Sequence, residues 1–171
     1  MSLRIQLLGK PKITDADGVA LSVRGHQSWA VLARVLLSER PVDRATLTAE
    51  LFADAADPLG ALRWCLAALR RAIGSEALTG DPIRPNLPAG TELDIEEIAD
   101  GSLDIAAAGE LLQGIEPKAS PHFATWLLIE RERLASRVTA RMRQEIMVAL
   151  SSGDHARAVD LGERAVARQP L

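Results

Sequence analysis

The sequence predicts a mainly α-helical protein with a small β component, built from two parts. Residues 1–100 are expected to form a winged helix-turn-helix, and residues 101–171 a helical segment. Three observations support this prediction. Residues 1–24 alternate between apolar and polar side chains, three helical patterns follow, and helical periodicity dominates after residue 101. A short second helix, followed by a third helix that opens into a hairpin, is the layout of a winged helix-turn-helix.

The first 24 residues are expected to form a small antiparallel sheet. Residues 3–7 (LRIQL) alternate apolar and polar side chains, which is the period of a half-buried strand. Asp17-Gly18 is a strong turn signal. The apolar side chains that alternate after this turn are Val19, Leu21 and Val23.

Two helices are expected next. Residues 27–38 place their apolar side chains on one stripe, as an amphipathic helix does. A second and shorter helix is predicted over residues 44–51. Asp43 precedes it and can accept hydrogen bonds from the free N–H groups of its first turn.

The third helix has the clearest local signals of the chain. Asp57-Pro58 combines an N-cap residue with proline at the first helical position, and Gly74 is a typical residue to end a helix. Apolar residues follow at steps of three and four, so one face is expected to lie on the core. These side chains are Leu59, Leu62, Leu66, Leu69 and Ile73.

Residues 77–95 are rich in turn residues and are expected to form the wing. This segment holds three prolines and two glycines between short apolar runs. That composition favours an irregular hairpin or loop over a regular two-stranded ribbon.

The C-terminal part is expected to be entirely helical. We predict a short helix over 104–112 that ends before Gly114, a long amphipathic helix over 122–151, and a final helix over 155–168 that Pro170 stops. Because the chain ends one residue after that proline, we expect the sequence to be part of a longer protein.

Composition and charge narrow the class of protein. No run of 18 apolar residues occurs among the 171, and the first ten residues lack a signal-peptide core, so neither a membrane nor export is expected. The single Cys65 fits a reducing compartment, and we expect a cytoplasmic protein. The net charge is −3, but residues 1–90 hold eleven Lys/Arg and nine Asp/Glu, while residues 91–100 hold five acids and no base. This acidic segment is expected to mark a junction between two modules.

Several segments of the N-terminal half follow one another in a recognisable order, namely 7-LLG-9, 17-DG-18, 30-AVLARVLL-37, 41-PVDRATLTAELF-52 and 62-LRWCLAALRRAIG-74. Their order resembles the Streptomyces antibiotic regulatory protein family, in whose N-terminal half lies a winged helix like that of response regulators of the OmpR type. The resemblance extends to the bacterial transcriptional activator domain that follows in that family, where Leu111, Leu112 and Gly114 match its pattern. Later matches are 110-ELLQGIEPKASPHFATWLLIERERL-134 and the residues Gly153, Asp154, Ala158, Ala165 and Pro170, which have the spacing of half a tetratricopeptide repeat.

The resemblance implies a function, a set of partners and a helical architecture. It implies a transcription regulator, usually an activator, that binds double-stranded DNA at promoter repeats and contacts RNA polymerase. It also implies that residues 101–171 are the tetratricopeptide-like start of an activator domain. A single repeat buries its apolar face only against a neighbour, so we expect homo-oligomers as well.

The outer face of the third helix carries the candidate DNA contacts. At 100° per residue, Arg71 lies opposite the apolar line, Trp64 lies near it, and Arg63 and Arg70 lie on one flank. In one interpretation the arginines contact guanines or phosphates, and Trp64 meets thymine methyl groups or sugars. In a second, the fold is kept but base recognition is lost, and Trp64 anchors a protein interface. In a third, Trp64 packs under the loop 78–90 and the arginines are solvated.

Three further residues are candidate contacts to DNA. Arg44 and Thr46 lie near the start of the predicted second helix, where free N–H groups favour phosphate. Arg84 is the only cation in the segment 83–93 and is the candidate wing contact. The family resembled usually has a Gly-Tyr pair in this wing, which this sequence lacks.

Enzymatic and metal-binding functions find no support in the sequence. The three histidines are far apart, without Cys or carboxylate at ligand spacing, and no glycine-rich phosphate loop occurs, so we expect no metal and no cofactor. Arg133, Arg137 and Arg141 form a row on the predicted long helix. They are either a docking stripe or a solvated face, with Glu130–Arg133 and Arg141–Glu145 at pairing distance. The competing function is a degenerate winged helix that serves as a protein-interaction module.

Overall fold

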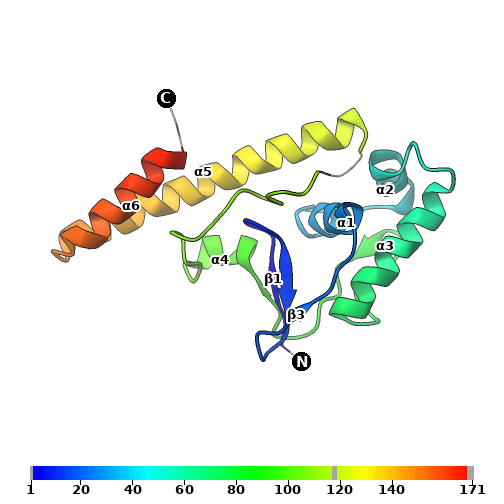
Figure 1. The fold of residues 1–171 in the computed structure, drawn as a ribbon, viewed down its shortest axis with the longest axis horizontal. Coiled ribbons are helices and arrows are strands. Elements are labelled where there is room, and N and C mark those ends of the chain that lie inside the picture. Colours follow the sequence, from blue (N-terminus) through cyan, green and yellow to red (C-terminus); the bar gives the residue numbers. More distant parts are fainter. Residues whose placement is uncertain (1, 117–118, 169–171) are drawn as a thin grey trace.

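The computed structural model describes residues 2–116 and 119–168, and it confirms a mainly helical fold with a winged helix followed by a helical segment. Three helices gather at one end of the molecule, with a small sheet below them (Figure 1). One long helix crosses above the sheet and continues beyond it, and the last helix folds back along its far half (Figure 1).

The sheet has four strands in the order β3-β2-β1-β6. β1 (Arg4–Gln6), β2 (Lys12–Thr14) and β3 (Ala20–Leu21) pair antiparallel, as the alternation in residues 1–24 predicts. β6 (Glu92–Leu93) pairs parallel to β1 and was not predicted. It brings the end of the winged helix back beside the start of the chain.

The three predicted N-terminal helices are present. They are α1 (His26–Leu36), α2 (Arg44–Leu51) and α3 (Pro58–Ile73). The side chain of Asp43 accepts a hydrogen bond from the N–H of Thr46, and that of Asp57 accepts one from Gly60, so both predicted N-caps are confirmed. The positions of these helices therefore follow from local sequence signals.

The core-facing side of α3 differs from the prediction at one position. Four of the five predicted anchors are at most 1% exposed, namely Leu62, Leu66, Leu69 and Ile73, whereas Leu59 is 54% exposed. Leu59 lies in the first turn, at the N-terminal end of α3. Helical periodicity gives the direction of its side chain but does not supply a neighbour to cover it.

The wing is a short hairpin of β4 (Thr79–Gly80) and β5 (Ile83–Arg84). Ile83 also forms an isolated bridge with Val42, which lies between α1 and α2. The side chain of Ile83 is fully buried, so this residue fixes the hairpin on the core of the winged helix.

The acidic segment 91–100, expected at a junction between two modules, folds against the N-terminal strand. It forms β6 and α4 (Asp94–Asp100). Arg4 forms ion pairs with Glu92 at 2.8 Å and with Glu97 at 2.7 Å. One carboxylate oxygen of Asp94 accepts hydrogen bonds from the backbone N–H groups of Leu7 and Leu8 at 2.8 and 2.7 Å. The acids are concentrated here because the N-terminal strand supplies donors to them.

The helix predicted over residues 104–112 is absent, because this segment pairs with the backbone of residues 7–9 instead. The N–H of Gly9 donates to the carbonyl of Glu110 at 2.7 Å, and the N–H of Leu112 donates to that of Leu7 at 2.8 Å. A Cβ at Gly109 would lie 2.4 Å from the Cα of Gly9, so only glycine permits this approach.

The two long C-terminal helices are confirmed as α5 (Pro121–Ser151) and α6 (His155–Arg168). They pack against each other along α6, with Ala158 and Leu161 buried between them. The predicted stop at Pro170 lies outside the described residues. Within the described chain, no helix is long and apolar enough to cross a membrane.

Candidate nucleic-acid interface

The outward face of α3 is uncovered along its length. Arg63, Trp64, Ala67 and Arg71 are all exposed, on the side opposite the buried leucines. The side chain of Arg63 is 69% exposed and lies 3.8 Å from the carboxylate of Asp57. Such an exposed ion pair contributes little to stability, so Arg63 can exchange it for another anion.

Arg71 lies at the centre of this face. Its Nε donates a hydrogen bond of 3.3 Å to the carbonyl of Ala67 in the preceding turn, and the residue is exposed. The guanidinium therefore lies close along the helix surface. Arginine presents five donors, so this contact leaves donors available for a phosphate or a guanine.

Arg70 has a structural role. It is half-buried, its Nε donates to the carbonyl of Ala77 at 3.0 Å, and its Nη2 donates to that of Leu78 at 2.7 Å. These two carbonyls belong to the turn that leads from α3 into the wing. Two donor groups of Arg70 thus hold the protein's own backbone, which favours a positioning role over the predicted direct DNA contact.

The start of α2 is already occupied by carboxylates. The Asp43 side chain accepts from the N–H and the hydroxyl of Thr46 at 2.7 and 2.9 Å. Hydrogen bonds from the backbone and then the hydroxyl of Thr46 lower the pKa of Asp43. Asp81 accepts from the N–H of Arg44 at 3.0 Å, and the Nε of Arg44 donates to the carbonyl of Gly80 at 3.2 Å. The backbone N–H groups of Arg44 and Thr46, where a phosphate was expected, therefore already donate to the carboxylates of Asp81 and Asp43.

The wing presents one cation. Arg84 is exposed on β5, where its backbone pairs with that of Thr79. The side-chain amide of Asn86 donates to the hydroxyl of Thr79 at 2.7 Å and closes the base of the hairpin. The exposed position of Arg84 leaves its guanidinium open to solvent.

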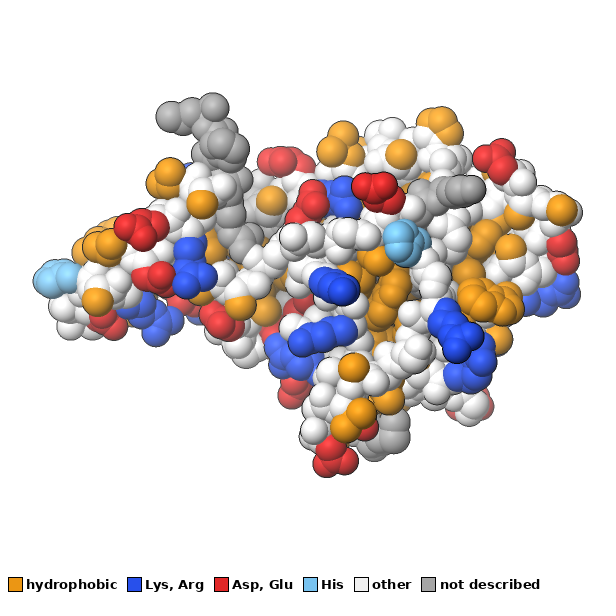
Figure 2. Space-filling model, in the orientation of Figure 1, with side chains coloured by type: hydrophobic (Ala, Val, Ile, Leu, Met, Phe, Trp, Pro, Cys, Tyr) orange, Lys and Arg blue, Asp and Glu red, His pale blue; other side chains and the backbone are white. Residues whose placement is uncertain are grey.

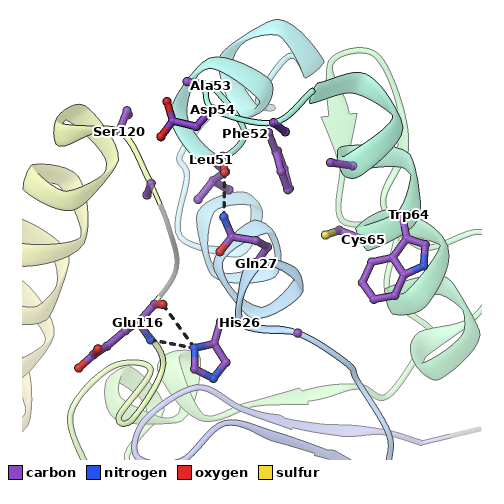
Figure 3. A pocket seen from close by; sticks show the side chains of 14 residues that line it. His26, Gln27, Leu51, Phe52, Ala53, Asp54, Trp64, Cys65, Glu116 and Ser120 are labelled. Carbon is purple, nitrogen blue, oxygen red and sulfur yellow. Dashed lines mark hydrogen bonds between the residues drawn. The ribbon is translucent and has the colours of Figure 1, made fainter. Parts of the chain in front are cut away.

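Trp64 borders a cavity of about 770 Å³ (Figure 3). The walls come from the start of α1, the end of α2 and the turn after it, one flank of α3, and the segment that leads into α5. Trp64 is 52% exposed, and a Cβ at Gly25 would lie 3.7 Å from its Cζ3 atom. The interpretation in which the loop 78–90 covers Trp64 is therefore wrong.

Four side chains join the winged helix to α5, and no local sequence pattern indicates them. Arg34 on α1 donates to both carboxylate oxygens of Glu50 on α2, at 2.8 and 3.1 Å. Its guanidinium carbon also lies 4.9 Å from the centre of the Trp126 ring on α5. His122 lies 3.7 Å from the same Glu50 carboxylate. These partners come from three helices, so only the tertiary structure reveals them.

The arginine row on α5 pairs largely with its own helix. Arg133 lies 2.7 Å from Glu130, and Arg141 lies 3.4 Å from Glu145, as the i, i+3 and i, i+4 spacings predict. Over α5 and α6, positive and negative side chains alternate on the face shown in Figure 2. Among the residues that the structure describes, no group of three His, Cys, Asp or Glu could hold a metal ion.

The comparisons with known proteins identify a shared fold. No family model and no curated protein matches the chain. The chain is similar in structure to Mycobacterium tuberculosis EmbR, solved in complex with a low-affinity phosphopeptide, with a TM-score of 0.57 and 16% sequence identity. The match covers 97% of this chain and 54% of the EmbR chain, so this chain spans about half the length of that protein. At this identity, the likeness shows that the two proteins share a fold in which a winged helix precedes a helical segment.

Proposed function

We propose that this chain is a DNA-binding transcription regulator that places the outward face of α3 in the major groove. One observation carries the proposal. The third helix of a winged helix presents two exposed arginines, Arg63 and Arg71, on a face that none of the described chain covers. In this fold that helix is the element that enters the groove.

The chemistry of this face favours contacts to the DNA backbone over extensive base recognition. Arg63 and Arg71 supply donors for phosphate oxygens or for guanine. Trp64 and Ala67 supply apolar surface for sugars or thymine methyl groups. Arg84 on the wing adds one more cation, while Arg70 holds the turn between α3 and the wing. Affinity is therefore expected to depend strongly on salt.

The proposed wider role is based on the family resemblance and on the shared fold. The order of segments resembles the Streptomyces antibiotic regulatory protein family, and EmbR has the same architecture. On this basis we assign the chain an activator role in the cytoplasm, with RNA polymerase as a partner. We place the boundary between the DNA-binding domain and the activator domain near residue 100.

Self-association belongs to the same proposal. Several apolar side chains on α5 and α6 are 47–73% exposed, and they lie toward the end where the two helices meet or on the outer side of α6. These residues are Met147, Val148, Leu150, Val159 and Val166. A helical repeat buries such a face against a neighbouring unit. A mass that rises with protein concentration in sedimentation measurements is the expected result, and a monomer at all concentrations would contradict it.

Titration of a fluorescent duplex at several salt concentrations tests the main proposal. The wild type is expected to bind a promoter-length duplex with an affinity that falls steeply with salt, by about 0.9 log unit per log unit of salt for each neutralised phosphate. Replacing Arg63 and Arg71 together by alanine removes two such contacts. The double variant should bind about tenfold more weakly at ~0.1 M salt, with a slope lower by about 2.

Arg143→Ala is the matched control, because Arg143 is exposed on α5, away from α3. It removes one positive charge without touching the proposed interface, and its affinity should stay close to that of the wild type. If the double variant binds DNA as the wild type does, the assignment to α3 is wrong. If the wild type itself shows no salt-dependent binding, the alternative function gains support: the exposed Leu59 and Trp64 would then make α3 a protein-interaction surface.

A further inference from the structure

The cavity beside Trp64 has the size and lining of a small-molecule binding site. Its volume of about 770 Å³ falls within the range of small-molecule pockets, which is roughly 300–1,000 Å³. Most of the side chains that line it are apolar or small. They include Ala55 and Ala61. Phe52 and Cys65 face the same space as the Trp64 ring (Figure 3).

The cavity lies where α1, α2, α3 and the residues just before α5 meet. Trp64 belongs to the helix that we propose enters DNA. At the other end, Asp54 and Ser120 lie close to the segment that leads into α5 (Figure 3). The N–H of Ser120 donates to the carbonyl of Glu50 at 2.8 Å, so this segment is attached to the end of α2. A molecule in the cavity would thus contact both α3 and the connection to α5.

The walls define the chemistry of an occupant. The half-exposed Trp64 ring offers a flat face, on which another aromatic ring gains stacking contacts beyond simple burial. The carboxylate of Asp54 accepts hydrogen bonds, so it favours a molecule that carries a donor. The thiol of Cys65 lies on an apolar wall, where burial raises its pKa and keeps it neutral.

We propose that this cavity binds a flat, multi-ring aromatic molecule that carries a hydrogen-bond donor. The ring system stacks on Trp64 and covers Cys65 and Ala61, and the donor reaches toward Asp54. Binding itself does not depend on the proposed function. The consequence that the ligand changes the affinity of α3 for DNA does rest on it.

Three matched probes test the two chemical requirements. 6-Hydroxyflavone is flat and has a donor, 6-hydroxyflavanone has the same donor but a puckered ring, and 6-methoxyflavone is flat without a donor. Isothermal titration should show that 6-hydroxyflavone binds several-fold more tightly than either analogue. The Asp54→Ala variant should bind 6-hydroxyflavone and 6-methoxyflavone equally, because it lacks the acceptor.

The tryptophan indole N–H signals in a nitrogen-15 NMR spectrum locate the binding. The chain has three tryptophans, and Trp64 is the one that lines this cavity. Its indole signal should shift with 6-hydroxyflavone, while that of Trp126 should stay in place. Ala61→Phe fills the cavity and should abolish the shift, whereas Ala67→Phe, on the exposed side of the same helix, should keep it. Thermal unfolding of both variants checks that they fold.

Each contrary result has a distinct meaning. Equal binding of all three probes, no binding of 6-hydroxyflavone, or binding that persists in Ala61→Phe overturns the proposal. A Trp64 signal that moves when the protein alone is diluted would assign the cavity to a second copy of the chain instead. A duplex titration with and without 6-hydroxyflavone forms a separate arm. If the probe binds but the wild type binds no DNA, the site stands and only the regulatory consequence fails.

Discussion

The guanidinium of Arg34 lies 4.9 Å from the centre of the Trp126 ring, and this contact joins the first helix of the winged helix to α5. The same guanidinium is bonded to both carboxylate oxygens of Glu50, whose side chain is 5% exposed. A paired charge at this depth holds α1, α2 and α5 in one arrangement. Arg34 therefore helps to fix the orientation of α5 relative to the winged helix, together with the bond from the N–H of Ser120 to the carbonyl of Glu50.

Replacing Arg34 by methionine is expected to destabilise the protein strongly. The change leaves the carboxylate of Glu50 buried without its partner, which typically costs about 3 kcal/mol. Urea unfolding followed by circular dichroism measures this loss. The double variant Arg34→Met/Glu50→Leu should recover at least half of it, since it removes the isolated charge.

The control for this prediction is Arg164→Met. Arg164 pairs with Asp160, but both side chains are about half exposed, at 49% and 55%. Its loss should cost less than about 0.5 kcal/mol. Equal losses of unfolding free energy in the two methionine variants would show that burial of the Arg34–Glu50 ion pair does not increase its contribution to stability.

Arg70 and Arg71 are neighbours in sequence with different expected phenotypes. Arg70→Ala removes two hydrogen bonds to the turn before the wing and should lower the free energy of unfolding by about 2 kcal/mol. Arg71→Ala should leave stability within about 0.5 kcal/mol and reduce the salt slope of duplex binding by about 1. Unfolding curves and duplex titrations separate the two roles. The reverse assignment, with Arg70→Ala stable and deficient in binding, would refute it.

Removing Asp81 is expected to improve DNA binding if α2 lies beside the DNA backbone. Asp81 accepts a hydrogen bond from the N–H of Arg44 and places a negative charge at the start of α2. Asp81→Ala exposes that N–H and removes a repulsion, so duplex affinity should rise about threefold at low salt. Asp160→Ala, on α6, changes the net charge equally and should leave the affinity unchanged. A gain of the same size in both variants would trace the effect to net charge alone.

The raised pKa of Asp94 leads us to expect a specific pH dependence of the free energy of unfolding. Its side chain is buried, and loss of solvation raises its pKa despite the hydrogen bonds from Leu7 and Leu8. The folded pKa then lies above the unfolded value of about 3.9. The stability that this group contributes is therefore complete below that value and is lost as the pH rises through the folded pKa. The difference in unfolding free energy between the wild type and Asp94→Asn should fall as the pH rises from about 4.

Asp100 provides the comparison of opposite sign. Hydrogen bonds from the hydroxyl and then the N–H of Ser102 lower its pKa. Its contribution is present above the unfolded pKa and is lost as the pH falls through the folded one. The difference between the wild type and Asp100→Asn should therefore stay constant between about pH 5 and 8. A constant difference for Asp94→Asn as the pH rises from about 4 would contradict the role given to its burial.

Local signals predicted the helices well. Asp43 and Asp57 cap α2 and α3 as their sequence positions predict, because a cap and its helix are within a few residues of each other. The long α5 also follows from its amphipathic period. These elements need no information from distant parts of the chain.

Long-range pairing limited the rest of the prediction. Residues 92–93 become a strand only because β1 lies beside them, and residues 110–112 form a bridge and a turn instead of a helix because residues 7–9 pair with them. The same holds for the site. The outward direction of Arg63 and Arg71 follows from helical period, whereas the attachment of Arg70 depends on carbonyls that only the folded turn places within reach.

α5 has 31 residues and extends beyond the sheet. At 1.5 Å per residue the helix is about 46 Å long, with its first turn attached to α2 and its last turn beside the start of α6. A rotation of about 5° around the attached end displaces the far end by about 4 Å, by the same geometry. Arg131 in the first half of the helix also donates to the carbonyls of Leu111 and Leu112, so a tilt of α5 moves α6 only if these contacts shift with it.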